Sequence, residues 1–302
     1  MTSTTTPTRR LITLSVALAA GAAVLGTPPA VAATPPEGAY WHTRTLMTET
    51  HPGRFGTRAH PYSLVERFVG VRWNAPDGRA WFGGRLLGVR PKTAADRKAW
   101  QRDGSPSTWS ETLDGKTVKL STRPGRGSLT AAPKGRDQFE FAGQRLTYDE
   151  IQRLPADPAR LKAWLMKAGR VGREMDLAAW VEETLPMLLH DIPAPKQVRA
   201  AAYQALLSLP GARVHGEAKD ELGRSGAALV IDRPGGKAKR APSTRVRMIV
   251  DTGRMVLLAQ DQLGTSGGKA SAEWSYRKTL IEVGWTDAPP AAPALSDTPS
   301  LP

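Results

Sequence analysis

The chain of 302 residues contains no cysteine. Disulfides, thiol catalysis, iron–sulfur clusters, cysteine-ligated zinc and lipid attachment at a cysteine are therefore excluded. Aromatic residues are scarce at 6%, although nine of them are Trp, and 28 Asp and Glu face 42 Lys and Arg, which gives a net charge of +14. With 40% hydrophobic and 23% charged residues, the composition is that of a folded protein rather than a disordered one.

Long apolar runs are nearly absent as well. The exception is residues 11–25, a charge-free apolar stretch that follows two arginines at positions 9 and 10. As a helix it spans about 22 Å, less than the ~30 Å hydrocarbon core of a bilayer. Two prolines and the small residues 30–33 complete the pattern of a secretory signal peptide. We expect residues 1–33 to be cleaved near Ala32 and Ala33, which makes the protein secreted or extracytoplasmic, in the cell envelope. The alternatives are an uncleaved anchor and, given the arginine pair, twin-arginine export.

Basic residues concentrate in residues 88–136, which hold eleven Lys and Arg but only four Asp and Glu. Periodicity is poor there, so we expect a loop-rich excursion from the sheet. Outside the cytoplasm the available polyanions are an anionic membrane surface or a cell-wall polymer, and not nucleic acid. The alternative is a solvated basic surface without a dedicated partner. The candidate basic surface consists of Arg90, Lys92, Arg97, Lys98, Arg123, Arg126, Lys134 and Arg136.

The mature chain is predicted to contain strands, then helices, then strands. Residues 40–87 are rich in β-branched and aromatic types, alternate in polarity over 65–73, and turn at Asp77 and Gly78. Residues 212–285 return to alternating strands, whereas the Pro- and Ala-rich residues 287–302 are predicted to be disordered. This order predicts a single α+β domain over residues 34–286, in which about three helices cover one face of an antiparallel sheet.

The helical segment covers residues 146–209. Thr147 and Glu150 have the spacing of a capping box for a short first helix. Asp157 is a favourable N-cap, and Pro158 suits the first position of the next helix because the N–H that it lacks would be unpaired there. A further helix is expected from Met175 and another from Pro195, each with one apolar side.

Four short segments resemble a family of secreted or membrane-anchored actinobacterial proteins of unknown function. The segments are residues 73–78 (WNAPDG), 102–106 (RDGSP), 154–161 (LPADPARL), and the block of 202–207 (AYQALL), 209–214 (LPGARV) and 251–253 (DTG). At fold level that family is similar to the LolA/LppX-like lipoprotein carriers and the RseB-type regulators of envelope signalling. The resemblance implies a curved antiparallel half-barrel whose concave face is plugged by helices around a hydrophobic cavity. Many relatives place a cytoplasmic segment before a membrane helix, whereas here a short signal comes first, and the resemblance implies no catalytic residues.

Three patterns suggest chemistry, but ordinary structural roles account for them better. Residues 264–268 match G-x-S-x-G around Ser266, yet a strand follows and no His lies downstream, so a glycine-rich loop is favoured over a hydrolase elbow. The spacing of His42, His51 and His60 would allow a zinc site, but no carboxylate pattern accompanies them. Adjacent carboxylates at 182 and 183, with one at 191, point apart on a helix, which favours a solvated face over an acid–base pair. No cofactor is expected.

We therefore expect a non-enzymatic, monomeric binding protein that holds a lipid or other apolar ligand between the sheet and the helices. Helical periodicity cannot distinguish a cavity lining from a dry core. The alternatives are a protein-interaction or sensor module in envelope-stress (sigma-factor) signalling and, less favoured, a secreted hydrolase. The candidate cavity residues are Leu161, Trp164, Leu165, Leu177, Trp180, Val181 and Leu188.

Overall fold

A computed structural model describes residues 36–51, 53–113, 116–133, 138–170, 176–233, 243–265 and 273–299. The predicted signal peptide lies outside these residues. Within them, no helix combines the length and hydrophobicity that a membrane-spanning helix needs.

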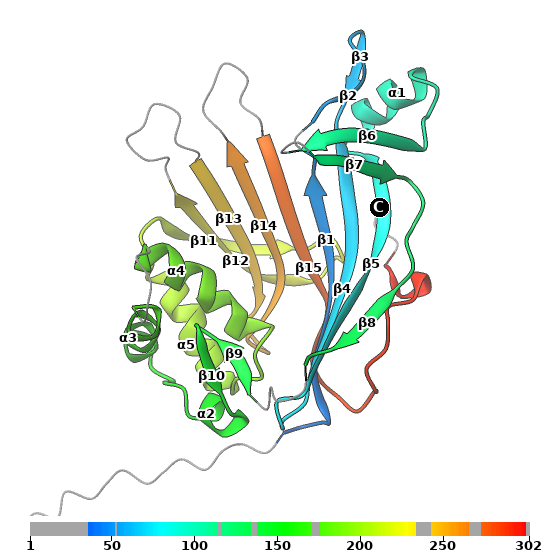
Figure 1. The fold of residues 1–302 in the computed structure, drawn as a ribbon. Coiled ribbons are helices and arrows are strands. Elements are labelled where there is room, and N and C mark those ends of the chain that lie inside the picture. Colours follow the sequence, from blue (N-terminus) through cyan, green and yellow to red (C-terminus); the bar gives the residue numbers. More distant parts are fainter. Residues whose placement is uncertain are drawn as a thin grey trace, which may run out of the picture. The chain divides into compact units, whose positions relative to one another are not determined.

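A nine-stranded antiparallel sheet forms the body of the protein (Figure 1). Its strands, in spatial order, are β11 (Ala212–Lys219), β12 (Ser225–Arg233), β13 (Ser243–Asp251), β14 (Val256–Thr265), β15 (Glu273–Thr286), β1 (Tyr40–Thr50), β4 (Leu64–Asn74), β5 (Ala80–Pro91) and β8 (Ser128–Ala131). The first and last of the long strands, β1 and β15, pair at its centre and join the N-terminal and C-terminal halves. The sheet is open, with β11 and β8 as its edges, and four register shifts introduce the irregularities that bend strands. The predicted α+β class is confirmed.

Helices cover one face of this sheet at the β12–β15 side (Figure 1). They are α2 (Tyr148–Gln152), α3 (Pro158–Gly169), α4 (Leu177–Thr184), the 3-10 helix η1 (Leu185–Leu189) and α5 (Lys196–Leu207), accompanied by the two-stranded β9 (Phe139–Phe141) and β10 (Gln144–Leu146). The capping box of Thr147 and Glu150 is confirmed, and Asp157 accepts from the Arg160 N–H as the N-cap of α3. Pro186 falls where α4 gives way to η1, as expected for a residue that cannot continue the helical hydrogen bonds.

The basic segment has more regular structure than its composition predicts. It contains α1 (Ala94–Arg102) and the hairpin of β6 (Thr108–Leu113) and β7 (Lys116–Ser121), beside a small hairpin of β2 (Phe55–Thr57) and β3 (His60–Tyr62). A capping box of Thr93 and Asp96 begins α1. A second hydrophobic cluster holds these pieces together: Phe55, Tyr62, Leu64, Val89 and Leu120, with Trp100 and Trp109 packed against it. Contacts between distant segments, which periodicity does not reveal, stabilise these short elements.

Residues 287–299, which composition predicts to be disordered, follow a described course that ends near the 3-10 helix η2 (Leu295–Asp297). Asp287 accepts a hydrogen bond from the Ala39 N–H at 3.0 Å. Pro293 is buried, and its carbonyl oxygen lies close to Gly127. The tail thus packs on the sheet by contacts of small residues that carry no periodic signal.

Candidate functional site

The helical residues that the sequence proposes as a cavity lining form a packed interface. Leu161, Leu165, Val181 and Leu188 are at most 1% exposed and share one hydrophobic core with strands β12–β15. Trp180 is also buried in this core, Trp164 is partly buried and stacks on Phe141 with centroids 6.0 Å apart, and Leu177 meets Gly169 of α3. None of these residues lines any of the three pockets described here, of about 910, 300 and 140 Å³.

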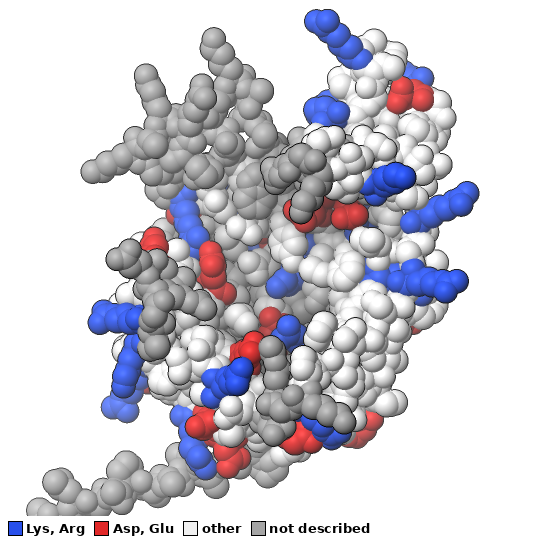
Figure 2. Space-filling view, viewed as in Figure 1, with Lys and Arg blue, Asp and Glu red and all other residues white. Residues whose placement is uncertain are grey.

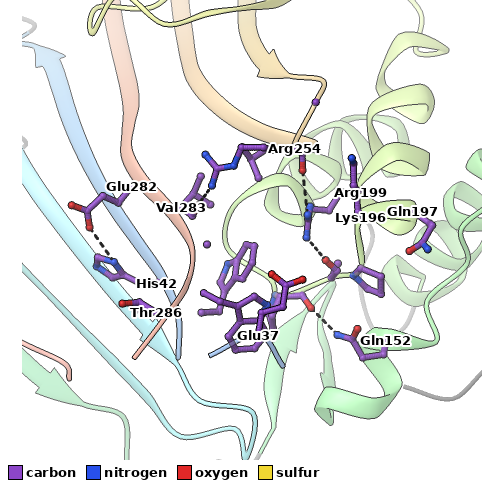
Figure 3. A pocket seen from close by; sticks show the side chains of 18 of the residues that line it. Glu37, His42, Gln152, Lys196, Gln197, Arg199, Arg254, Glu282, Val283 and Thr286 are labelled. Carbon is purple, nitrogen blue, oxygen red and sulfur yellow. Dashed lines mark hydrogen bonds and ion pairs between the residues drawn. The ribbon is translucent and has the colours of Figure 1, made fainter. Parts of the chain in front are cut away.

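The largest of these pockets, of about 910 Å³, is lined by charged and polar side chains together with apolar ones such as Trp41, Val256 and Trp285 (Figure 3). Its cations hold neighbouring segments together: Arg199 donates to the Met255 carbonyl at 3.0 Å, and Arg254 donates to the Val283 carbonyl at 2.8 Å. Burial lowers the pKa of Arg199 and raises the pKa of Tyr148 to about 12. Charged and polar groups are thus mixed with apolar ones around this pocket, which does not have the predominantly apolar lining that a lipid chain requires.

A different surface has that apolar lining. The strand register places Lys278 of β15 opposite Met47 of β1. Met47 in turn pairs with Phe68 of β4, and Phe68 pairs with Leu86 of β5. Paired residues of neighbouring strands point to the same face, so one cation and three apolar side chains form a row across the helix-bearing face. At about 4.8 Å between strands, the row extends about 14 Å. We call these four residues the trough floor.

Part of this apolar surface is open to solvent. Leu86 is 45% exposed, and Phe82, four residues earlier on the same face of β5, is 49% exposed. They are two of the four exposed large hydrophobic side chains in the described chain. Neighbouring exposed apolar side chains on one face favour a binding surface more than single scattered ones do.

Two glycines beside the trough floor allow its side chains to lie flat. Gly70 and Gly84 pair across β4 and β5. A Cβ atom on Gly84 would overlap the ring of Phe68, and one on Gly70 would lie 3.1 Å from the Met47 Cε. A glycine inside a strand often marks the close approach of another group. Here the close groups are the floor's own side chains, which lie against the backbone of the two glycines.

Walls stand on two sides of the floor. On one side, Val89 of β5 and Leu120 of β7 pack in the second hydrophobic cluster. On the other, the segment after η1 crosses the sheet: Trp41 Nε1 donates to the His190 carbonyl at 2.7 Å, and Asn74 Nδ2 donates to the Asp191 carbonyl at 3.4 Å. Figure 2 shows this face hollowed between the helices and the β6–β7 region, with charged side chains of both signs around the hollow. We call the hollow above the trough floor the trough.

A charged cluster stands where the trough meets the helices. His190 Nδ1 lies 2.8 Å from the Pro186 carbonyl, which can only accept, so Nδ1 carries the proton. Its Nε2 is then free to accept from Lys278 Nζ at 3.3 Å, and Asp191 Oδ2 lies 3.3 Å from the same nitrogen. Burial lowers the pKa of His190, and Lys278 and Arg72 lower it further, against the opposing effect of Asp191.

The carboxylate of this cluster stays ionised. Burial raises the pKa of Asp191, but His190, Lys278 and Arg72 together outweigh it, so the net pKa is lowered. Burial also raises the pKa of Tyr276, on the next row of the same face, to about 12. Near neutral pH the cluster therefore has two cations, one anion and a neutral imidazole, with a net charge of +1.

The other predicted site residues are dispersed. Lys92, Arg97 and Lys98 lie at or in α1, Arg90 is in β5, and Arg123 and Arg126 follow β7. Lys134, Arg136 and Ser266 lie outside the described residues.

The candidate metal-binding and acid–base groups have other contacts. His42 stacks on Trp73 at 4.2 Å, and His51 meets Phe55 edge-on. Glu182 pairs with Arg233 at 2.6 Å. Within the described ranges, no three His, Asp or Glu are grouped as metal ligands would be.

Comparison with known proteins identifies no family. No family model and no curated protein matches the chain. Among solved structures, a β-barrel-like protein of the domain of unknown function DUF1849 from Brucella abortus is 10% identical, with a TM-score of 0.18, over 83% of this chain and 99% of that one. Lipovitellin, a structure concerned with lipid–protein interactions, is 7% identical with a TM-score of 0.25, over 85% of this chain but 26% of lipovitellin. At these scores both are distant neighbours, and the resemblance to LolA-like carriers and RseB-type regulators stays a prediction.

The trough floor was not anticipated from the sequence. Its apolar members come from three strands, and they meet only through the register. One signal was present: β4 and β5 have apolar residues on both faces and four internal glycines, Gly70, Gly83, Gly84 and Gly88. Strands with apolar residues on both faces are expected to have both faces packed against other groups. The described elements instead leave Phe82 and Leu86 half exposed.

Proposed function

We propose that this protein is an extracytoplasmic, monomeric and non-enzymatic carrier that binds an amphipathic lipid-like ligand in the trough. In this proposal the open, bent sheet is the half-barrel of a LolA-like carrier, and α2–α5 are its plug. The observation that supports it is the row of Lys278, Met47, Phe68 and Leu86, a continuous strip that combines one cation with exposed apolar surface.

The energetics favour a ligand with both an apolar chain and a charged head. Each methylene removed from water contributes about 0.8 kcal/mol, so ten of them give about 8 kcal/mol. Association itself costs about 4–15 kcal/mol in lost freedom, which offsets much of that gain. A chain lying in the trough therefore gains from a second interaction at one end.

The structure offers that second interaction to an anion. Lys278 lies opposite Met47 at one end of the floor, and Arg72 lies opposite Phe82. Among the described residues, neither cation has a carboxylate within 4 Å, although Asp191 lowers the local charge. A carboxylate or phosphate head at this end would pair with either cation while the chain extends over Phe68 towards Leu86.

The proposal is tested by displacement of a fluorescently labelled hexadecanoic acid from the purified chain. Unlabelled hexadecanoate should displace the probe, and Leu86→Asp and Phe82→Asp should each weaken binding at least about tenfold, because they place a charge where the chain must lie. The matched control is Val214→Asp on edge strand β11, where the side chain is 61% exposed and far along the sheet. Absence of probe binding, or an equal loss in the control, would contradict the proposal.

A further inference from the structure

One end of the protein is rich in cations. The residues are Arg54, Arg58, Lys92, Arg97, Lys98 and Arg102, which come from α1, its N-terminal approach and the β2–β3 hairpin. We call them the α1-end cations. None of the six forms an ion pair with an acid among the described residues, although the Arg54 guanidinium donates to the Pro61 carbonyl at 3.2 Å.

Two acids of the same segment, Asp96 and Asp103, make hydrogen bonds inside the structure. Asp96 accepts from the backbone N–H of Thr93 at 3.0 Å and from that of Ser63 at 2.9 Å. Asp103 accepts from the Tyr62 hydroxyl at 3.0 Å. Even if both carboxylates are counted, six cations against two anions leave this end with a net charge of +4.

The elements that carry the α1-end cations are held together by hydrogen bonds and hydrophobic packing. Tyr62 accepts a hydrogen bond from Trp109 Nε1 at 3.0 Å while it donates to Asp103, and so it joins β3, β6 and the end of α1. Trp100 Nε1 donates to the Pro106 carbonyl at 3.0 Å. The second hydrophobic cluster lies beneath this network. The positions of the α1-end cations are therefore held by a packed unit rather than by a free loop.

The shape of the α1 end suits binding to a flat surface better than binding to a single polymer chain. In Figure 1, α1 and the β2–β3 hairpin project beyond the neighbouring strands, and Figure 2 shows Lys and Arg atoms together with some Asp or Glu atoms over this projection. None of the α1-end cations lines any of the three pockets described above. A groove would be expected for a gripped chain, whereas a projecting charged end can meet a flat anionic layer.

We propose that the α1 end docks the protein on an anionic lipid bilayer. Basic side chains within a Debye length of such a surface, about 8 Å at physiological salt, are attracted to it individually, so six in one rigid unit act together. The same hydrophobic cluster forms one wall of the trough, so docking would bring the trough close to the bilayer. That last step rests on the proposed function, whereas the docking itself does not.

The test is sedimentation of the full-length purified protein with phosphatidylcholine vesicles that contain or lack phosphatidylglycerol. The protein should sediment only with the anionic vesicles, and salt should release it. Arg97→Glu combined with Lys98→Glu should reduce partitioning at least about tenfold. Both residues are exposed on α1, and an unchanged unfolding midpoint would show that the variant folds.

The matched control is Arg123→Glu combined with Arg126→Glu, which makes the same change in net charge on exposed residues outside the α1 end. It should retain most of the binding. Equal loss in both double variants, equal binding to neutral vesicles, or binding to heparin without binding to vesicles would overturn the proposal. Leu86→Asp should still sediment with the vesicles, and the Arg97 and Lys98 variant should still bind the fatty acid, so the two proposals fail separately.

Discussion

Lys278 Nζ lies 3.3 Å from His190 Nε2, on the side of the imidazole away from its bond to the Pro186 carbonyl. The two contacts together fix one neutral tautomer, with the proton on Nδ1 and the lone pair of Nε2 towards the ammonium group. A buried neutral histidine beside a cation resists protonation, and this sets the pH behaviour of the trough's inner end.

We predict that His190 makes folding stability fall in mild acid. Burial lowers the pKa of His190 in the folded state below its ordinary value of about 6.5, so the unfolded chain takes up the proton first. The contribution of His190 is complete above pH 6.5 or so and is lost as pH falls towards the folded pKa. Asp191, whose pKa is lowered, adds a separate loss below pH 4 or so.

The measurement is denaturant unfolding between pH 8 and pH 5 or so for the wild type and His190→Gln, whose amide does not titrate. The variant should show a smaller loss of stability over this range. An identical pH dependence in the two proteins would show that His190 is not the titrating group.

Arg72 should contribute to binding of a charged head and not of an uncharged one. Its guanidinium stands opposite Phe82, and the Arg72 side chain is exposed, so Arg72→Gln should leave the fold intact. An exposed ion pair contributes about 0.2–1 kcal/mol, so hexadecanoate affinity should fall roughly up to fivefold. Displacement by the methyl ester should not change. A parallel loss for acid and ester would assign Arg72 a packing role instead.

Gly84→Ala should distort the trough floor. The new methyl group would overlap the Phe68 ring and approach the Val69 carbonyl, so the ring must leave its place. Overpacking of this kind destabilises by about 1–3 kcal/mol. Gly125→Ala is the control, because its methyl group would lie 3.6 Å from the Leu86 Cβ, an ordinary contact. Denaturant midpoints of the two variants should differ clearly; equal midpoints would mean that Phe68 does not press on Gly84.

Leu165→Ala tests whether the helix–sheet interface is filled. Leu165 is fully buried in the core, so truncation should cost about 2–5 kcal/mol of unfolding free energy. Leu295→Ala, at a side chain that is 50% exposed, should change it by no more than about 0.5 kcal/mol. If a ligand cavity adjoins Leu165, its truncation costs much less, and added hexadecanoate stabilises the variant.

Tyr62→Phe should loosen the base of the α1 end. The change removes the acceptor of Trp109 Nε1 and the donor to Asp103, and an unpaired buried polar group costs about 1–3 kcal/mol. Tyr40→Phe is the control, because Tyr40 contacts Trp81 through its ring. Thermal unfolding compares their stability, and hydrogen exchange of α1 should accelerate in the Tyr62 variant alone. Unchanged exchange would show that the tyrosine hydroxyl does not hold α1.

The helix starts illustrate which structural features can be predicted from neighbouring residues in the sequence. Thr147 with Glu150, and Asp157 with Pro158, act through hydrogen bonds within one turn, so sequence spacing is sufficient to locate them. The same rule applied to Thr93 and Asp96 would have found α1. The β6–β7 hairpin is different, because its side chains pack on residues about fifty positions earlier, such as Tyr62, and no local pattern carries that information.

In the candidate site, too, local features could be predicted from the sequence, whereas contacts between distant residues could not. Apolar periodicity correctly placed Leu161, Leu165 and Leu188 on the inner side of their helices, but it could not tell a lined cavity from a filled core. The trough floor depends on which residue of each strand faces which, and a slip of one position would turn Phe68 and Leu86 to the opposite face.

The amino-acid sequence by itself determined the α+β order, the helix starts, the excess of basic residues and the absence of thiol chemistry, because composition and short-range hydrogen bonding act along the chain. Only the tertiary structure decided that Lys278 meets Met47, that Asp96 and Asp103 are used internally, and that six cations stand together at one end. Strand register and packing join residues as far apart in the sequence as Ala39 and Asp287, which are 248 positions apart, and such contacts exist only once the chain has folded.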